Sequence, residues 1–336
     1  MIKNGLINFL RFISPIFSEK KLIAKSNQVI FLPFYHCISN TNHEYIKNLY
    51  PVRNEKIFIN DLDFFTHYFK PVDLDFLLNN KTVKEPVFHL SFDDGLSDVY
   101  NVIAPILLKK GIPASFFVNT DFIDNKDLFF RYKASIIIEK FKNYTKKELL
   151  IKKINKNISL HLSVNNFNTI IKSIDYNNKH ILDKIAVLID IDFNEYLQTN
   201  KPYLTTKQIN ELIKKGFTIG SHSMSHPEYR TIKYIDQIKQ TTESMKFITD
   251  NFKPKHKIFS FPFTDYNVSL DFFNYIYKNN IVDYSFATAG LKIDNLNKNF
   301  QRFAMDGTLI PADKLVKAEY LYFLFKKIFN KNVIYH

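Results

Sequence analysis

Residues 87–118 constrain the fold most, because they place a strand, a helix and a second strand within about 30 residues. The run from Val87 to Phe92 is almost entirely apolar, and Gly95 permits a sharp turn directly after it. A helix is predicted to follow and to end at Gly111, and residues 112–118 form the next strand. Strands joined in this way pair in parallel, so the segment predicts an α/β fold.

Seven strands, most of them separated by helices, are predicted along the chain. They occupy residues 28–36, 87–92, 112–118, 217–221, 257–261, 282–288 and 300–305. An open doubly wound sheet is one possible arrangement. A barrel of parallel strands fits better, because polar residues follow the strands and sites form where the carboxyl ends of barrel strands meet. These polar residues are His36, Asp93, Asp94, Asn119, His222, Asp265 and Asp306.

Residues 129–202 differ in character from the rest of the chain. They are rich in Lys, Asn and Ile, and they contain no glycine. Helical periodicity near 130–156 and 165–187 predicts a mostly helical insertion that packs on the main body. We therefore expect one domain over residues 1–336, interrupted by this insertion and ending in a C-terminal helix within 308–336.

The net charge of +13 is compatible with several anionic partners, including nucleic acid and lipid. The basic residues are scattered, however, and form no arginine-rich strip. A solvated lysine surface is the simpler interpretation, and we do not expect nucleic-acid binding. Cys37 is the only cysteine, which excludes an internal disulfide and is compatible with a reducing compartment.

The first residues are apolar, but Arg11 and Pro15 interrupt them and no small-residue cleavage site follows. No signal peptide is therefore predicted. No stretch approaches roughly 18 uncharged apolar residues, the length that a membrane span requires. A surface-lying amphipathic helix is one interpretation of residues 5–17, with peripheral membrane contact. We expect a cytoplasmic protein, peripheral to the inner membrane if that helix binds it.

Two short stretches carry the candidate chemistry. Asp93 and Asp94 end a predicted strand, although adjacent carboxylates before a glycine are also typical of a turn. His222 and His226 are four residues apart, so both imidazoles can face one point; ordinary surface histidines share this spacing. Two histidines with a carboxylate suit Zn²⁺, Co²⁺, Ni²⁺ or Fe²⁺. Because each stretch ends a strand, we expect both on the same rim.

Strand alternation separates the residues of the first stretch. His89, Ser91 and Asp93 share one face, so Asp93 is predicted to point into the mouth of the barrel. Asp94 lies beyond the end of the strand, so the alternation does not predict the direction of its side chain. His89 lies roughly 13 Å below Asp93 at the usual rise of a strand, and we interpret it as a core histidine.

Ser91-Phe-Asp-Asp-Gly95 resembles the first motif of the NodB-type polysaccharide deacetylases, carbohydrate esterase family 4. His222-Ser-Met-Ser-His226-Pro resembles their second motif, and residues 109–118 and 215–221 are also similar. The resemblance covers about 28–128 and 203–307 and omits the insertion. It implies a distorted (β/α)7 barrel of the NodB-homology type. It also implies a metal-dependent hydrolase that removes N-acetyl or O-acetyl groups from a polysaccharide or glycan intermediate.

The resemblance also implies roles for individual residues. Asp94, His222 and His226 would bind a divalent metal, with Zn²⁺ as the first choice among the four ions. Asp93 would be the general base, and an N-acetylated glycan would be the substrate. The third motif of the family places a backbone N–H after a proline to stabilise the oxyanion, and Pro262-Phe263 matches it. Phe263 is therefore the expected donor.

Two departures from the family pattern concern the base and the acid. No arginine lies in 259–261 to steady the base, so we name Arg302 as a candidate from another strand and group it with the substrate-site residues. No histidine lies in 302–306, where the family carries its general acid. Asp306 and His36 are the candidates, although His36 is equally compatible with a buried histidine bonded to backbone. A metal- and sugar-binding relative that has lost turnover is therefore the alternative function.

Overall fold

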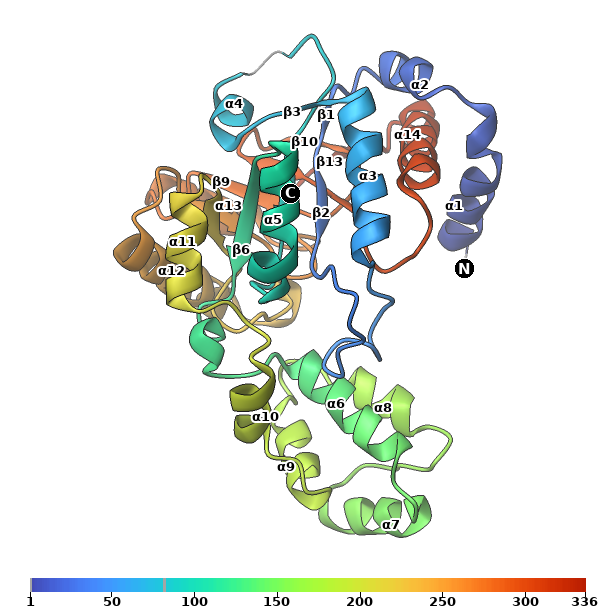
Figure 1. Cartoon of the computed structure of the whole chain (residues 1–336), viewed down its shortest axis with the longest axis vertical. Coiled ribbons are helices and arrows are strands. Elements are labelled where there is room, and N and C mark those ends of the chain that lie inside the picture. Colours follow the sequence, from blue (N-terminus) through green and yellow to red (C-terminus); the bar gives the residue numbers. More distant parts are fainter. Residues whose placement is uncertain (1, 81–82) are drawn as a thin grey trace.

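The computed structural model describes residues 2–80 and 83–336. Figure 1 shows a parallel sheet rolled nearly into a barrel, with helices packed around it. This confirms the predicted α/β barrel. The strand order is β11-β9-β8-β7-β6-β5-β2-β12. The strands are β2 (Pro33–Tyr35), β5 (Leu90–Phe92), β6 (Ala114–Val118), β7 (Thr218–Ser221), β8 (Ile258–Ser260), β9 (Tyr284–Ala287), β11 (Asn299–Gln301) and β12 (Phe303–Ala304).

The barrel is closed by a single segment of chain, residues 299–304, which changes partner at Arg302. On one side of Arg302, β11 pairs with β9; on the other, β12 pairs with β2. The Arg302 N–H donates to the Ala287 carbonyl at 3.0 Å, and the next N–H donates to the Leu32 carbonyl at 2.8 Å. The eight strands are therefore the seven predicted ones, with the last divided in two.

The first and second predicted strands are each divided as well. β1 (Ile30–Phe31) leaves the barrel and forms a small sheet of order β1-β4-β3 with β4 (Val87–Phe88) and β3 (Lys70–Pro71). Pro33 has no N–H to donate, which is consistent with a break in the ladder beside it. The barrel proper begins only after these breaks.

His89 lies between β4 and β5 and is a core histidine, as expected. Its Nδ1 lies 2.9 Å from the Val72 carbonyl and its Nε2 lies 2.9 Å from Ser115 Oγ. Burial lowers its pKa to about 4, so the ring is neutral at physiological pH.

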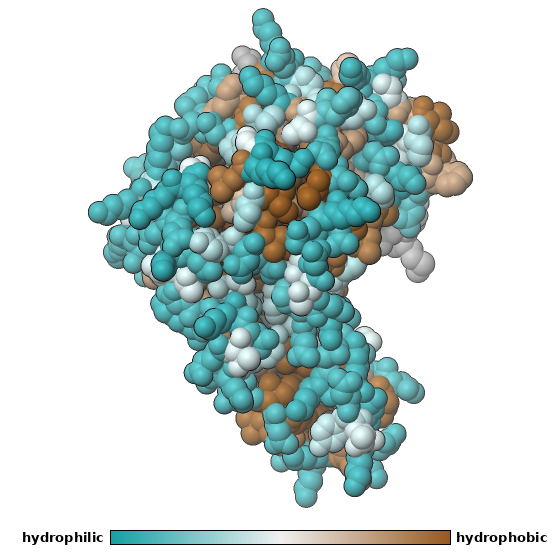
Figure 2. Space-filling model, in the orientation of Figure 1, coloured by the Kyte–Doolittle hydropathy of each residue, from teal (hydrophilic) through white to brown (hydrophobic). Residues whose placement is uncertain are grey.

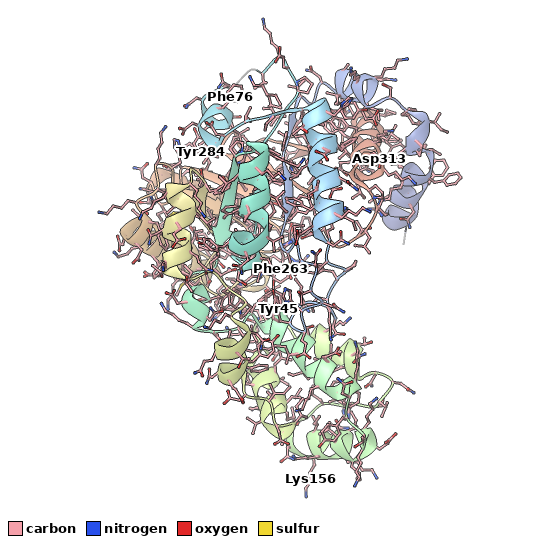
Figure 3. All side chains as sticks on the ribbon, viewed as in Figure 1. Tyr45, Phe76, Lys156, Phe263, Tyr284 and Asp313 are labelled. Carbon is pink, nitrogen blue, oxygen red and sulfur yellow. The ribbon has the colours of Figure 1, made fainter. Side chains whose placement is uncertain are left out.

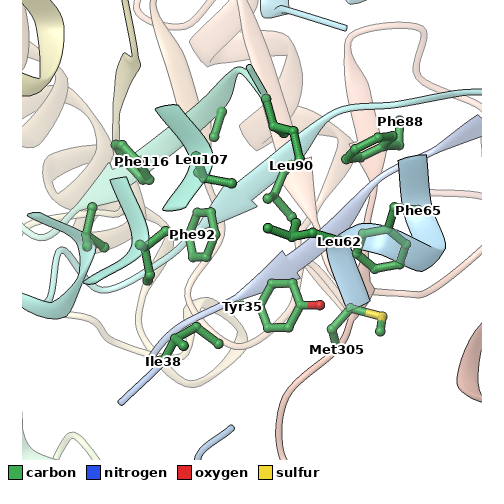
Figure 4. Close-up of a cluster of buried hydrophobic side chains, with 14 of the residues drawn as sticks. Tyr35, Ile38, Leu62, Phe65, Phe88, Leu90, Phe92, Leu107, Phe116 and Met305 are labelled. Carbon is green, nitrogen blue, oxygen red and sulfur yellow. The ribbon is translucent and has the colours of Figure 1, made fainter. Parts of the chain in front are cut away.

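The helices of the main body pack their apolar sides against the sheet. The largest core cluster combines aliphatic and aromatic side chains, and Phe92, Phe88 and Tyr35 are fully buried in it (Figure 4). Burying each such ring stabilises the fold by roughly 1.5–3 kcal/mol. These helices are α3 (Glu55–Tyr68), α4 (Leu74–Asn79), α5 (Ala104–Lys110), α11 (Thr206–Lys214), α12 (Tyr234–Phe252), α13 (Leu270–Lys278) and α14 (Ala312–Ile328).

Short irregular turns connect these elements. A single π-helical turn, Val99–Ile103, precedes α5, and Gly111 ends α5 with a φ of 65°. Short 3₁₀ turns lie at Ser14–Ile16, Ile123–Asn125 and Tyr229–Thr231. Near the C-terminal end, β10 (Ile293–Asp294) and β13 (Val333–Ile334) form a two-stranded parallel ladder.

The segment between β6 and β7 is mostly helical and projects from the carboxyl end of the barrel (Figure 1). Its apolar residues form one cluster with Cys37, Tyr45 and Leu96, which belong to loops of the barrel. The segment is thus fastened to the rim where sites are expected. Its helices are α6 (Phe130–Lys142), α7 (Lys147–Asn157), α8 (Phe167–Ser173), α9 (His180–Leu188) and α10 (Phe193–Asn200).

Two helices near the N-terminal end, α1 (Ile2–Ile13) and α2 (Glu19–Ser26), pack beside α14 (Figure 1). Leu10 of α1 packs against Ala318 and Tyr322 of α14. Among the residues described, no helix has both the length and the apolar character needed to cross a membrane.

Candidate active site

Of the polar residues predicted at the strand ends, His36, Asp93, Asp94 and His222 line one cavity of about 530 Å³ between the barrel rim and the helical segment. Asn119, Asp265 and Asp306 do not line it. Asp93 and Asp94 follow β5, whereas His222 and His226 follow β7. Phe263, labelled in Figure 3, lies at this junction. The parallel ladder explains the convergence, because it brings the ends of distant segments to one rim.

Asp93 and Arg302 form a buried, two-pronged ion pair. Arg302 Nη1 donates to Asp93 Oδ1 at 2.8 Å and Nη2 donates to Oδ2 at 2.7 Å. Ser91 and Ser260 accept the remaining Nη hydrogens, and both ionic side chains are 1% exposed. Burial alone raises the pKa of Asp93, but the charge and hydrogen bonds of Arg302, together with the nearby His222 and His36, outweigh burial and the net pKa is lowered. Asp93 is therefore an oriented carboxylate.

Asp94, His222 and His226 bring three potential metal ligands together. Asp94 Oδ1 lies 3.2 Å from His226 Nε2 and 3.6 Å from His222 Nε2. Asp94 Oδ1 and His222 Nε2 are buried, and neither has a hydrogen-bond partner among the described residues. Buried polar atoms are seldom left unpaired, and each costs about 1–3 kcal/mol. One carboxylate and two imidazoles with atoms free for a ligand fit a divalent metal.

The outer atoms of these ligands are held by two residues that the sequence did not point to. The Ser260 carbonyl lies 2.9 Å from His222 Nδ1, which leaves Nε2 as the lone-pair nitrogen when Nδ1 carries the proton. Tyr132, from α6, donates its hydroxyl to Asp94 Oδ2 at 2.7 Å. Ser260 belongs to a predicted strand, but Tyr132 lies in the inserted segment, where no motif marks it.

The charges of the cluster favour metal-ligating protonation states. Burial lowers the pKa of His222 to about 4, so its ring is neutral. Burial alone raises the pKa of Asp94, but its interactions with His226, His36 and His222 together outweigh burial, so the net pKa is lowered and the carboxyl is ionised. Neutral imidazole and carboxylate are the forms that bind metals.

His36 and Asp306, predicted as separate candidates for the general acid, are in contact. His36 Nδ1 lies 2.7 Å from Asp306 Oδ2, and the His36 backbone N–H donates to the same oxygen at 2.7 Å. Burial lowers the pKa of His36, but Asp306 outweighs it and raises the pKa to about 10. The two residues thus form one unit, in which a protonated imidazole faces the cavity and Asp306 holds it.

Four non-glycine residues of the site have positive φ angles: Asp94 (72°), Ser223 (70°), His226 (58°) and Phe263 (59°). Such conformations cost about 1–3 kcal/mol each and cluster at functional sites. The left-handed backbone of Asp94 lies just after β5, and that of His226 lies in the loop after β7. Gly95, with a φ of 62°, continues the turn, and a Cβ there would lie 2.9 Å from the Val118 side chain.

The cavity walls are aromatic, and the helical segment supplies one side of them. Phe129, Arg131 and Tyr132 come from that segment, opposite Phe263 of the barrel. The Arg131 guanidinium lies 5.9 Å from the centre of the Phe263 ring. Of the residues grouped as substrate-binding in the sequence, only Phe263 lines the cavity; Arg302 is buried beneath the floor and contacts Asp93. Pro262 is not among the lining residues.

A family model for polysaccharide deacetylases matches residues 80–278, more than half of the chain. The chain belongs to the polysaccharide deacetylase family. It is accordingly a hydrolase that acts on amide or ester bonds of sugars.

Solved structures of similar fold support this placement. The deacetylase PplD of Streptococcus pyogenes is 16% identical with a TM-score of 0.55, over 86% of this chain and 97% of that one. IcaB of Ammonifex degensii is 12% identical with a TM-score of 0.52, over 87% and 97%. A de-N-acetylase of Aggregatibacter actinomycetemcomitans is 18% identical with a TM-score of 0.50, over 86% and 99%. These identities show a shared fold. A search for relatives among curated proteins found no match.

Proposed function

We propose that the protein is a divalent-metal-dependent deacetylase that hydrolyses N-acetyl groups of a glycan, with Zn²⁺ as the first candidate ion. The observation that carries this proposal is the pair of buried, unpartnered ligand atoms on Asp94 and His222 beside an ionised Asp93. An O-acetylated sugar is the other substrate that the same chemistry would accept.

Asp94, His222 and His226 would hold the metal. When bound, the metal supplies a Lewis acid that polarises the acyl carbonyl and lowers the pKa of water. Asp93 would accept the proton of the attacking water, because it is ionised at neutral pH and Arg302 holds its carboxylate in place. Asp93 Oδ2 lies 4.0 Å from His222 Nε2, so base and ligands adjoin.

His36 would donate the proton to the leaving nitrogen. It keeps that proton at neutral pH through Asp306, and it lines the same cavity as Asp93. The Phe263 N–H would stabilise the oxyanion, and Phe263 already holds the positive φ that presents its backbone. The aromatic walls of Phe129 and Phe263 would contact the apolar faces of the sugar.

The alternative function is a sugar-binding relative without turnover. It depends on the absence of an arginine in 259–261 and of a histidine as general acid in 302–306. Arg302 contacts Asp93 from a different strand, and His36 with Asp306 offers a proton at the cavity. No specific observation therefore favours the alternative over the enzyme.

Measuring acetate release from a panel of N-acetylated glycans, with and without added Zn²⁺ or Co²⁺, tests the proposal. Asp93→Asn should lower turnover by about 10²–10⁴-fold and retain stoichiometric metal. It also leaves the Arg302 charge without its partner, so a loss of about 3–5 kcal/mol in stability is expected and urea unfolding should be measured in parallel. Asp94→Asn should lose the metal. Wild-type protein that binds no stoichiometric metal at neutral pH would refute the proposal.

We further propose a cytoplasmic location, peripheral to the inner membrane. The apolar and basic character of the N-terminal helix supports membrane contact, and the single, buried Cys37 is compatible with a reducing compartment. Separation of soluble and membrane fractions, followed by immunodetection, tests the location. Recovery outside the cytoplasm would contradict the location, and recovery only in the soluble fraction would contradict the membrane contact.

A further inference from the structure

Helix α1 is apolar on more than the face that it packs. Leu10 is buried against α14, yet Phe9 and Phe12 of the same helix are 57% and 82% exposed. Ile16, directly after α1, is also 82% exposed. Figure 2 shows hydrophobic residues at this edge of the molecule, over α1. Packing within the fold does not explain why these apolar side chains are exposed.

The exposed apolar side chains continue onto the end of α14. A groove of about 940 Å³ lies between the 14–26 segment and α14, and Phe17, Leu22 and Leu324 line it. At its far end, Ile328 is 75% exposed and Phe329 is 55% exposed. Helix α1, the groove and the end of α14 together form one surface, which we call the α1–α14 surface. Exposed apolar patches of this kind mark interaction sites.

Basic residues surround the α1–α14 surface. Lys21, Lys25 and Lys327 line the groove, and none has an acidic partner among the described residues. The acidic Glu19 is already paired with Lys317 at 2.9 Å. In sequence, residues 1–28 and 312–331 together hold ten Lys or Arg and three Asp or Glu, more than half of the net charge of +13.

We propose that the α1–α14 surface binds anionic phospholipid bilayers. Protruding Phe and Ile side chains with lysines beside them match an interface whose interior is apolar and whose headgroups are negative. Self-association through the same surface is disfavoured, because a two-fold contact would place Lys21, Lys25 and Lys327 against their own copies. The inference is independent of the deacetylase reaction, since α1 and α14 lie outside the catalytic cavity.

Vesicle binding tests this proposal directly, because the chain contains no tryptophan. A Phe12→Trp variant would carry a single indole reporter on the α1–α14 surface. Its emission should shift to the blue with vesicles of 70% phosphatidylcholine and 30% phosphatidylglycerol, and brominated lipids should quench it. Leu149→Trp, at a 60% exposed position on α7, is the matched control and should not respond.

Two sets of substitutions separate the apolar contribution to vesicle binding from the electrostatic contribution. Phe12→Ser with Ile16→Ser should weaken binding at least tenfold, and both side chains are too exposed for their loss to unfold the protein. Lys21→Gln, Lys25→Gln and Lys327→Gln together should abolish the preference for phosphatidylglycerol and most of the salt dependence. Leu149→Ser should bind like the wild type.

Three results would overturn the proposal. The first is no binding of the wild type to the vesicles that contain 30% phosphatidylglycerol. The second is equal binding by the Phe12→Ser/Ile16→Ser variant. The third is a wild-type dimer, measured by light scattering, that this variant abolishes, which would assign the surface to a second copy of the chain. Deacetylase activity on a soluble substrate should be unchanged in all variants, so failure here is distinguishable from failure of the proposed function.

Discussion

Among the residues that the structure describes, two clusters combine carboxylates with imidazoles whose ligand atoms lie within 4.8 Å of one another. One is Asp94, His222 and His226 at the barrel rim. The other is Asp265, Asp294 and His336, where β10 meets the last residues of the chain. By residue type alone, either cluster is suitable for a metal.

Hydrogen bonding distinguishes the two clusters. In the second, Asn299 and Gln301 each donate to both carboxylates at 2.8–2.9 Å, and His336 lies 2.9 Å from Asp294. In the first, ligand atoms of Asp94 and His222 have no partner among the described residues. The second cluster is a satisfied polar network that anchors neighbouring segments. Unsatisfied buried atoms therefore indicate a ligand better than composition does.

The pKa values of His222 in the first cluster and His336 in the second are shifted in opposite directions. Burial lowers the pKa of His222 to about 4. Burial lowers that of His336 too, but the hydrogen bond and charge of Asp294 reverse this, so the net pKa is raised. A lowered pKa favours the neutral imidazole that can bind a cation, whereas a raised pKa favours the protonated form, which cannot.

The largest difference in metal affinity between the two clusters is expected when one histidine is removed from each. His226→Ala should weaken Zn²⁺ or Co²⁺ binding by more than about 100-fold, because even changes outside the ligands cost about 10–100-fold. His336→Ala should leave metal affinity unchanged. Isothermal titration calorimetry on both variants measures this, and equal losses would remove the distinction between the clusters.

Removing an amide donor from the second cluster should affect stability only. Asn299→Ala leaves the Asp265 and Asp294 oxygens short of a partner, and we expect the free energy of unfolding to fall by about 1–3 kcal/mol. Urea denaturation gives this value. A substantial loss of metal affinity in the same variant would show that the second cluster binds metal.

Tyr132→Phe removes one hydrogen bond from the first cluster without a change of shape. Because the hydroxyl orients Asp94, metal affinity should fall about 10-fold. Tyr203→Phe, which alters a buried tyrosine bonded to the Phe129 N–H, is the matched control and should leave metal affinity unchanged. The inserted segment would be merely a cover for the cavity if Tyr132→Phe bound metal as well as the wild type.

A further difference between the clusters is expected in how pH affects the stability of the metal-free protein. The raised pKa of His336 gives stability that is complete below about pH 6.5 and is lost as pH rises through that raised value. The lowered pKa of His222 acts in the opposite sense, so stability is lost as pH falls from about 6.5 towards 4. Urea unfolding measured from about pH 4 to above pH 7 tests both. His336→Gln should reduce the loss of stability on the alkaline side, to which His36 also contributes, and should leave the acidic side unchanged.

Much of this arrangement could be predicted because it depends on local sequence. Short apolar strands alternating with helices indicate a parallel barrel, and carboxylates or histidines at strand ends are then brought to one rim. The placement of Asp93 and His89 follows from the two-residue alternation of a strand. Such features need only a few neighbouring residues.

What could not be predicted depends on contacts between distant segments. Tyr132 reaches Asp94 from α6, and nothing in the sequence around it marks that role. His36 and Asp306 were each predicted near the site, yet their pairing across 270 residues has no local signal. The sharing of Arg302 between Asp93, Ser91 and Ser260 likewise needs three strands in place at once.

The change of partner at Arg302 has a consequence for the order in which the protein is made. Asp93 leaves the ribosome some 200 residues before Arg302, so during synthesis its carboxylate has no counter-ion from the final strand. The same segment that closes the barrel delivers that counter-ion. A nascent chain that has not reached residue 302 therefore has an open barrel and an unsupported base, so closure of the fold and the onset of hydrolytic activity coincide in time.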